Sequence, residues 1–497
     1  MPSALLLTAA SAALYSAAFP PLSLAWLAWV ALAPWLLALA RVGPVRATTL
    51  GLLWGVAIGF GTGWSLVEMV AGYLGQPRWV GWATLLTVSA VTAGLPCAAF
   101  AACVSWLGRR GAGSPFVVGA VFALCELGRS HFLVGNPWAT VATSQVESAV
   151  VQSAALIGPY GVALLIGAFN AALAALVQPA LRGPHFAREG ALVAAATLAA
   201  SVYGQGVLHG ALDGGAPLRV AIVQGAVERD LAWRPEHRRA GLTRHLELSA
   251  QAPPESADLL VWPESAVTFY LQEESAERAA LLEAVRARGG TLLLGAPHYD
   301  AREGGRPRYH NSVYAIADGQ LVARYDKQHL VPFAEERTLG FAADERATYS
   351  RGVKTAPLDA ANTRLGTFVC FEAMYPDLVR QAVRAGAEVL VNVSNDAWFG
   401  SEAAARHHLQ HAILRAIESR RYLVRATSTG YSAIVDPLGR VVTRSAYGTP
   451  DVLLGPVEPR RELTWYARLG DWPLLVSSAA LLLVRLLGAS QHRAMPR

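Results

Sequence analysis

Arg364-Leu-Gly-Thr-Phe-Val-Cys370-Phe-Glu372 is an apolar, strand-like run that ends on a cysteine. A helical pattern over 375–385 follows at once, so the thiol is expected at a sharp strand-to-helix turn. Such a turn exposes a nucleophile close to free backbone N–H groups. A lone cysteine is more often a buried structural residue. Two polar sites upstream nevertheless favour a nucleophile here.

The chain as a whole is too apolar for an ordinary soluble protein. It has 497 residues, of which 16% are charged, and its mean hydropathy is +0.32. A membrane span needs about 20 mainly apolar residues. Eight runs meet or approach that requirement: 5–18, 24–40, 50–74, 80–107, 115–133, 155–177, 191–207 and 472–487. We expect the first to be a retained helix, because it lacks the basic start of a signal peptide.

The arginines between these runs predict the orientation of the chain. Arg41, Arg46, Arg109, Arg110, Arg182, Arg188, Arg493 and Arg497 all fall on one side if both termini are cytoplasmic. The polar insert then lies in the periplasm of a bacterial inner membrane. We expect a membrane domain over 1–210, a periplasmic domain over 211–466, and an eighth span with a cytoplasmic tail over 467–497. Without a basic stripe with interleaved aromatics, the net charge of +6 indicates topology and not a nucleic-acid partner.

Cysteine usage strengthens the case for Cys370. Cys97, Cys103 and Cys125 lie in apolar runs, so the periplasmic insert contains a single thiol. An unpaired thiol in an oxidising compartment is a liability unless it has a task. This pattern favours a functional cysteine.

The insert alternates strand and helix patterns, which indicates an α/β domain with helices covering a sheet. Strands are expected at 218–224, 258–262, 291–295, 311–317, 321–325, 364–370, 388–393, 431–435 and 440–443. Helices are expected at 234–250, 274–288, 375–385 and 403–425. Asp318-Gly319 is a strong hairpin signal between two of the strands.

Two further polar sites follow strands in the same manner as Cys370. Val261-Trp-Pro-Glu264 places a carboxylate just past a strand end, and Arg324-Tyr-Asp-Lys327 does the same for an amine. Taken singly, Glu264 is more readily a helix cap, and Lys327 is more readily a solvated charge at a strand end. Together they supply a proton acceptor, a cation for a developing oxyanion and a thiol that can attack an acyl carbonyl.

In this order the three sites resemble the Glu–Lys–Cys triad of the nitrilase superfamily. The apolar spans before and after the insert make the whole chain similar to the apolipoprotein N-acyltransferase family. Further matching stretches are Lys327-Gln-His-Leu-Val-Pro-Phe-Ala-Glu335, Asn392-Val-Ser-Asn-Asp-Ala-Trp-Phe-Gly400, Glu126-Leu-Gly-Arg129 and Asn136-Pro-Trp138. The resemblance implies a nitrilase-like α-β-β-α sandwich inserted between the seventh and eighth helices of an eight-helix membrane domain.

The resemblance also implies roles for individual residues. Glu264 is the proton acceptor, Lys327 stabilises the oxyanion and Cys370 is the nucleophile. Supporting positions are Glu335, Glu372, Phe371 and the loop residue Trp233. Phe371 stands where the family usually has tyrosine, which leaves an aromatic wall without a hydroxyl.

The implied reaction takes an acyl chain from a phospholipid onto Cys370 and transfers it to the amine of a diacylglyceryl-cysteine on an apolipoprotein. It implies no cofactor and no metal, and we expect a monomer. A membrane-anchored amidase, in which water takes the acyl group, would have the same triad. A single helix would be enough to anchor such an enzyme, whereas eight apolar runs suggest that the protein handles lipids. A transporter predicts broken spans or repeats, and the sequence has neither convincingly.

Two other polar groups admit a structural reading. His407, His408 and His411 share a helix face, but no further ligand motif accompanies them, so a polar helix face is favoured over zinc. Glu126 and Arg129 are ionisable residues in or near a span. They suit a functional site and a mutual ion pair equally well.

Overall fold

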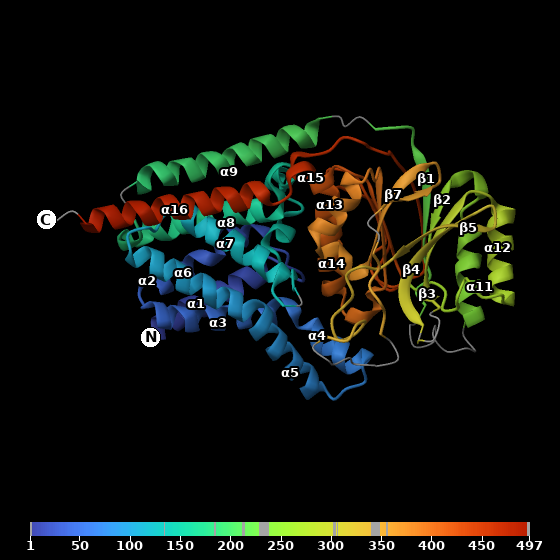
Figure 1. Ribbon diagram of the computed structural model, residues 1–497, viewed down its shortest axis with the longest axis horizontal. Coiled ribbons are helices and arrows are strands. Elements are labelled where there is room, and N and C mark those ends of the chain that lie inside the picture. Colours follow the sequence, from blue (N-terminus) through green and yellow to red (C-terminus); the bar gives the residue numbers. More distant parts are fainter. Residues whose placement is uncertain are drawn as a thin grey trace. The chain divides into compact units, whose positions relative to one another are not determined.

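The computed structural model describes residues 2–133, 135–182, 185–210, 214–227, 238–301, 305, 307–338, 348–353 and 356–494 (Figure 1). The chain divides into two compact units. One comprises Met1–Gly210 with Leu469–Arg497, and the other comprises Ala211–Arg468.

The first unit is helical. Its helices are α1 (Pro2–Ala17), α2 (Ala28–Ala40), α3 (Pro44–Gly63), α4 (Ser65–Glu68), α5 (Arg78–Val88), α6 (Leu95–Arg109), α7 (Pro115–His131), α8 (Ala154–Val177), α9 (Phe186–His209) and α16 (Trp472–Ala494). Within the described part of the chain, four helical segments are long and apolar enough to cross a membrane: Pro44–Gly63, Arg78–Arg109, Ala149–Val177 and Phe186–His209. Pro2–Ala17, Ala25–Ala40 and Trp472–Gly488 are shorter apolar helices. Several apolar helices are therefore present, and the count of eight spans stays a prediction.

Small and aromatic side chains pack the helical unit. A Cβ on Gly51 of α3 would lie 2.4 Å from the carbonyl oxygen of Cys97 in α6, so only glycine permits this helix contact. The buried rings of Trp35 and Trp54 stack with their centroids 4.3 Å apart. Close backbone approach and ring stacking replace the hydrophobic effect, which does not drive helices together in lipid.

Glu126 and Arg129 form a buried structural clamp at the end of α7. Arg129 Nη1 lies 2.7 Å from Glu126 Oε1, and Nη2 donates to the carbonyl of Trp138 at 2.9 Å. The second oxygen of Glu126 accepts from the N–H of Val141 at 2.8 Å. The ion pair thus fastens the segment after α7 to the helix, which is the structural alternative left open by the sequence.

The second unit contains two six-stranded sheets in its described residues. The first has the order β12-β1-β2-β3-β4-β5 and the second the order β11-β10-β9-β8-β7-β6. The strands of the first are β1 (Leu218–Gln224), β2 (Leu259–Val261), β3 (Thr291–Asp300), β4 (Arg308–Ala317), β5 (Gln320–Asp326) and β12 (Asp451–Val457). Those of the second are β6 (Leu358–Ala360), β7 (Thr363–Val369), β8 (Val389–Ser394), β9 (Leu423–Thr427), β10 (Ala433–Val435) and β11 (Val441–Arg444). The central strands β1, β2 and β3 run parallel, as do β7, β8 and β9.

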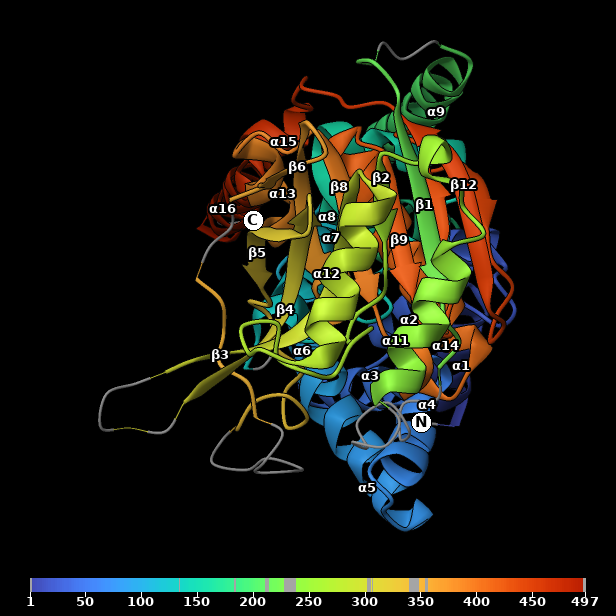
Figure 2. The ribbon, with the colours of Figure 1, turned by 90° about the vertical axis from the view of Figure 1, so that its right-hand side faces the viewer.

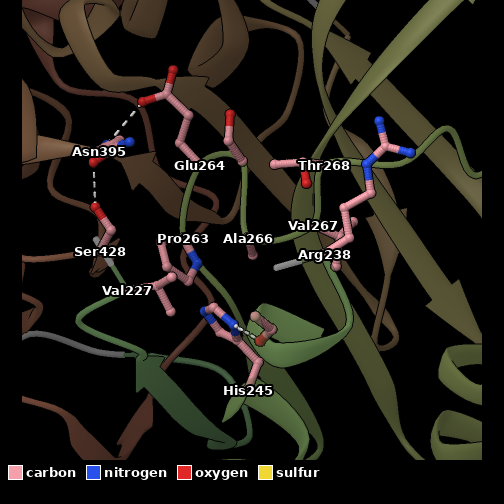
Figure 3. Close-up of a pocket in the computed structure, with 12 residues that line it drawn as sticks. Val227, Arg238, His245, Pro263, Glu264, Ala266, Val267, Thr268, Asn395 and Ser428 are labelled. Carbon is pink, nitrogen blue, oxygen red and sulfur yellow. Dashed lines mark hydrogen bonds between the residues drawn. The ribbon is translucent and has the colours of Figure 1, made fainter. Parts of the chain in front are cut away.

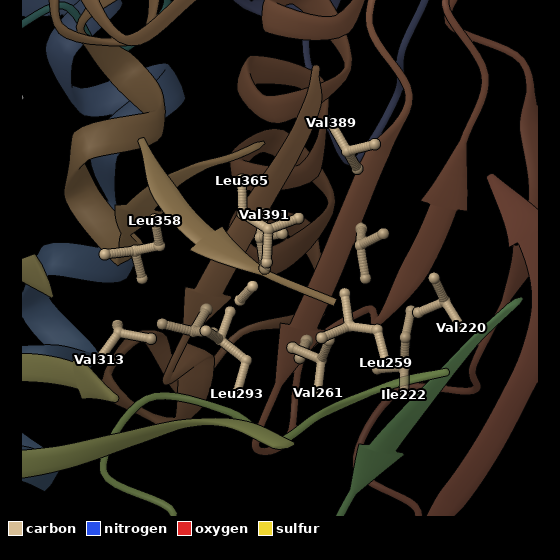
Figure 4. Close-up of a cluster of buried hydrophobic side chains, with 14 of the residues drawn as sticks. Val220, Ile222, Leu259, Val261, Leu293, Val313, Leu358, Leu365, Val389 and Val391 are labelled. Carbon is tan, nitrogen blue, oxygen red and sulfur yellow. The ribbon is translucent and has the colours of Figure 1, made fainter. Parts of the chain in front are cut away.

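Helices cover the outer face of each sheet, so the unit has α-β-β-α layers. The helices α11 (Arg238–Ser249) and α12 (Ala276–Arg288) lie over the first sheet (Figure 2). The helices α13 (Pro376–Arg384) and α14 (Glu402–Ser419) lie over the second (Figure 1). Aliphatic residues from both sheets, such as Val220, Leu259, Leu365 and Val391, form the core between them (Figure 4). The predicted mixed α/β fold is confirmed. Burial on both faces explains why these strands are continuously apolar.

The sequence-based element boundaries were wrong in one important place. The helix predicted over 403–425 ends at Ser419, because Arg420 adopts the left-handed conformation with φ 53°. Residues 423–427 form strand β9 instead. The short strand β6 and the edge strand β12 were not predicted, and the part of the predicted helix over 234–237 lies outside the described residues.

Candidate active site

The three residues of the predicted triad follow strands whose ends meet at one side of the sandwich. Glu264 comes three residues after β2, Lys327 directly after β5 and Cys370 directly after β7. Strand β5 is antiparallel to β4, and β4 to β3, so β5 points the same way as β3 and β2. Residues just past the carboxyl ends of such strands converge on a common edge.

Lys327 lies between two carboxylates in the buried site. Its Nζ is 3.4 Å from Glu264 Oε1 and 2.8 Å from Glu335 Oε2. The side chains of all three are at most 4% exposed. Burial opposes the charge on Lys327, but the two carboxylates outweigh it and raise the lysine pKa well above its ordinary value. The two carboxylates therefore favour the charged form of the amine.

Glu264 is held by two donors besides Lys327. The side-chain amide of Asn311 donates to Glu264 Oε1 at 2.7 Å and to Glu335 Oε1 at 3.1 Å. The backbone N–H of Asn395, just after β8, donates to Glu264 Oε2 at 2.8 Å (Figure 3). Both carboxylate oxygens are thus fixed in direction, as a proton acceptor requires.

A glycine in β3 allows the Glu264 loop to lie against the sheet. A Cβ at Gly295 would approach Glu264 Cα to 2.6 Å and Ser265 N to 2.5 Å. The backbone N–H of Gly295 also donates to the carbonyl of Pro263 at 3.1 Å. No larger side chain fits at this position unless the loop that carries Glu264 moves.

Cys370 occupies a strained turn at the end of β7. Its φ is +49°, a left-handed value that non-glycine residues seldom adopt. Burial and the nearby Glu264 charge raise the pKa of the thiol, while the Lys327 cation lowers it. These mutual shifts place Glu264, Lys327 and Cys370 within electrostatic range of one another.

Glu372 is a buried brace between the segments that carry Cys370 and Lys327. Its Oε2 accepts from the N–H of Val369 at 2.6 Å, and its Oε1 accepts from the N–H of Gln328 at 2.6 Å and of His329 at 3.0 Å. The hydroxyl of Tyr325 also donates to it. Burial raises the pKa of Glu372 to about 7, although the three backbone N–H groups lower it.

Aromatic rings border the nucleophile. Phe371 is half-buried and meets the ring of Tyr375 edge-on, with centroids 5.3 Å apart. Tyr375 in turn stacks on His329 at 4.3 Å. Trp233, the other aromatic residue expected here, lies outside the described residues.

A cavity borders Glu264 on the side of α11. Its walls include Val227, His245, Pro263, Thr268 and Ser428 (Figure 3). His245 is buried, and its Nδ1 donates to the carbonyl of Gly241 at 2.9 Å. The loop that carries Glu264 therefore forms part of the wall of this cavity.

Sequence reasoning missed Asn311 and assigned no role to the buried charges near Cys370. Asn311 lies at a buried position of β4, and Arg425 lies at a buried position of β9. A polar residue at a fully buried strand position needs partners. That signal was present, but the partners come from other strands and become known only with the fold.

The sandwich and its strand-end carboxylate, amine and thiol define a nitrilase-superfamily site. Residues 219–464 match the carbon-nitrogen hydrolase family, and residues 11–172 match the apolipoprotein N-acyltransferase N-terminal domain. The apolipoprotein N-acyltransferase of Geobacter metallireducens is 32% identical over 96% of this chain and 94% of its own length. That of Azotobacter vinelandii is 34% identical over 99% and 96%. The chain belongs to the apolipoprotein N-acyltransferase family.

A solved structure also resembles part of the chain. The carbon-nitrogen hydrolase from Helicobacter pylori is 19% identical, with a TM-score of 0.39, and the match covers 52% of this chain and 94% of that chain.

Proposed function

We propose that this membrane-bound acyltransferase works through a thioester on Cys370, with Glu264 as the proton acceptor and Lys327 as the oxyanion stabiliser. The observation that carries the proposal is the buried Lys327–Glu264 contact of 3.4 Å within electrostatic range of the only cysteine in the second unit. Glu335, Glu372, Phe371 and Trp233 support the site.

In the first half-reaction the acyl donor is a phospholipid. The thiol proton of Cys370 passes to Glu264 while sulfur attacks the ester carbonyl. A carbon–sulfur bond forms, and Lys327 with backbone N–H groups after Cys370 stabilises the oxyanion. The ester carbon–oxygen bond then breaks, and Glu264 returns the proton to the departing lysophospholipid oxygen.

In the second half-reaction the acceptor is the neutral amine of a diacylglyceryl-cysteine at an apolipoprotein N-terminus. The amine attacks the thioester, a carbon–nitrogen bond forms and the carbon–sulfur bond breaks. Glu264 accepts the amine proton and passes it to the departing sulfur of Cys370. Because Asn311 and Asn395 direct both oxygens of Glu264, one carboxylate can serve both half-reactions.

The apolar helices suit two lipid substrates. Exposing a CH₂ group to water costs about 0.8 kcal/mol, so a diacyl chain leaves a bilayer only at great cost. We assign 1–210 to a membrane domain of seven helices, 211–466 to a periplasmic catalytic domain, and 467–497 to an eighth helix and cytoplasmic tail. We place the enzyme in the bacterial inner membrane. We also expect it to be a monomer.

The transfer step is tested with enzyme acylated from a phospholipid with an isotope-labelled chain and freed of donor. On adding a diacylglyceryl-cysteine peptide, we expect the label in an amide on the peptide amine. An N-acetylated peptide is the matched control and should stay unlabelled. Label released only as free fatty acid would identify a hydrolase and contradict the proposal.

A further inference from the structure

A buried cluster of charged side chains lies behind Cys370 and has no role in the triad chemistry. It consists of His408 from α14, Asp396 after β8 and Arg425 from β9, each at most 1% exposed. His408 Nε2 is 2.9 Å from the carbonyl oxygen of Cys370. His408 Nδ1 is 2.9 Å from Asp396 Oδ1. The imidazole therefore bridges an aspartate and the backbone of the nucleophile.

Both partners of the His408 ring are hydrogen-bond acceptors. A carbonyl oxygen has no hydrogen to give, and Asp396 is ionised: burial alone would raise its pKa, but Arg425 and His408 hold it well below the ordinary value. Arg425 Nη2 donates to Oδ2 of Asp396 at 2.8 Å and to Oδ1 at 3.1 Å. Its 3.1 Å separation from His408 Nδ1 is then a contact of two donors that share one carboxylate. Donation to both acceptors requires a hydrogen on Nδ1 and another on Nε2 of His408.

Neighbouring titratable groups are consistent with a charge confined to His408. His407 and His411 lie on the same helix, with ring centroids 5.2 Å apart. Burial and, after it, His408 lower the pKa of His407 to about 3. Burial, His407, Arg415 and His408 lower the pKa of His411 well below its ordinary value. Both shifts disfavour the charged form of these two rings.

The bond from His408 acts on the peptide that follows the nucleophile. The Cys370 carbonyl and the Phe371 N–H belong to one peptide group. A cation at the carbonyl oxygen polarises that group and makes its N–H a stronger donor. It also fixes the turn in which Cys370 has φ +49°. The N–H directly after a nucleophile is the usual donor to an acyl oxyanion.

We propose that His408 is a positioning residue: a buried imidazolium, anchored by Asp396 and Arg425, that holds and polarises the Cys370–Phe371 peptide for the oxyanion. The inference rests on the proposed function, because it takes Cys370 as the acylated nucleophile. The proposal adds a charge at the backbone carbonyl of Cys370. Helix α14 carries this charge, whereas Glu264 and Lys327 follow strands of the first sheet.

Two substitutions separate the hydrogen bond from the charge. Gln in His408→Gln can present a neutral donor where Nε2 stands, whereas Asn in His408→Asn is too short to reach the Cys370 carbonyl. The rate of acyl-enzyme formation is measured by intact-protein mass spectrometry with full-length enzyme at increasing phospholipid concentration. By comparison with the loss of a single oxyanion donor, we expect roughly a 10-fold lower maximal rate for His408→Gln and ~100-fold for His408→Asn. KM for phospholipid should stay unchanged, because the bond acts on the transition state.

The matched control is His407→Gln, which changes a buried histidine one position earlier on α14. It should keep the wild-type rate per folded enzyme. A merely structural role predicts equal losses in His408→Gln and His408→Asn that follow the folded fraction seen by circular dichroism, and that result would overturn the proposal. Wild-type rates in both variants would overturn it as well. Failure of the wild-type enzyme to form an acyl-enzyme would instead overturn the proposed function.

A spectroscopic measurement on the wild-type protein does not depend on how the variants fold. In protein labelled with ¹⁵N only at histidine, we expect one imidazolium signal that persists at pH 8 and is lost in His408→Gln. If every histidine of the wild-type protein is neutral at that pH, the charge on His408 is disproved.

Discussion

At the residue scale, Lys327 sets the charge balance of the site. One buried ammonium contacts both Glu264 and Glu335. These two carboxylates raise the pKa of Lys327 and so stabilise its charged form. A guanidinium would not fit between carboxylates whose positions Asn311 fixes from the other side. The sequence predicted Glu264, Lys327 and Cys370 as neighbours, and the structure places Lys327 Nζ 3.4 Å from Glu264 Oε1. The sequence did not identify Asn311, because its side-chain partners Glu264 and Glu335 lie in the segments that follow β2 and β5.

Glu372 gives the folded unit a pH-dependent stability. Its pKa rises from an ordinary 4.5 to about 7 on folding. The folded state therefore holds the proton more tightly, and this contribution is complete below about pH 4.5 and lost as pH rises through about 7. The difference corresponds to about 3 kcal/mol at most.

The measurement is the unfolding midpoint of the purified enzyme and of Glu372→Gln between pH 5 and pH 8, followed by circular dichroism. We expect the advantage of the wild type over the variant to shrink as pH rises. Glu283→Gln, at a carboxylate with 69% exposure, is the control and should leave the pH profile unchanged. A constant gap between wild type and Glu372→Gln would show that the carboxyl does not titrate in this range.

At the element scale, the strand ends decide where the chemistry lies. The continuous apolar runs of β1, β7 and β8 were predicted within one residue at each end, because strands buried on both faces carry little else. Strand β9 was read as helix, since Arg425 and the preceding residues continue the pattern of α14. The left-handed turn at Arg420 that separates them has no glycine to signal it.

Gly295 of β3 offers a test of how closely the elements must approach. In Gly295→Ala the new methyl would meet the Glu264 backbone at 2.6 Å, so the loop must move. We expect acyl transfer to fall ~100-fold or more, as a misplacement of about 1 Å commonly does. Gly241→Ala in α11 is the matched control: nothing lies within 4 Å of its added Cβ, and activity should be unchanged. Normal activity in Gly295→Ala would show that the loop tolerates displacement.

At the scale of the whole molecule, the arginines between the helices predict the orientation in the membrane. The exposed residues Arg46 and Gln320 test it, because the first lies in the first turn of α3, a candidate span, and the second lies in the catalytic unit. In intact cells, a membrane-impermeant maleimide should label Gln320→Cys and leave Arg46→Cys unlabelled until the membrane is opened. The wild-type enzyme gives the background from its own four cysteines. Labelling of Arg46→Cys alone would reverse the topology.

The central claim is a covalent acyl group on one sulfur. Purified enzyme is mixed with phospholipid, digested and analysed by mass spectrometry with and without hydroxylamine. We expect a fatty-acyl mass on the peptide that contains Cys370, removed by hydroxylamine and absent from Cys370→Ala. An enzyme that transfers acyl chains while this peptide stays unmodified would contradict the thioester mechanism.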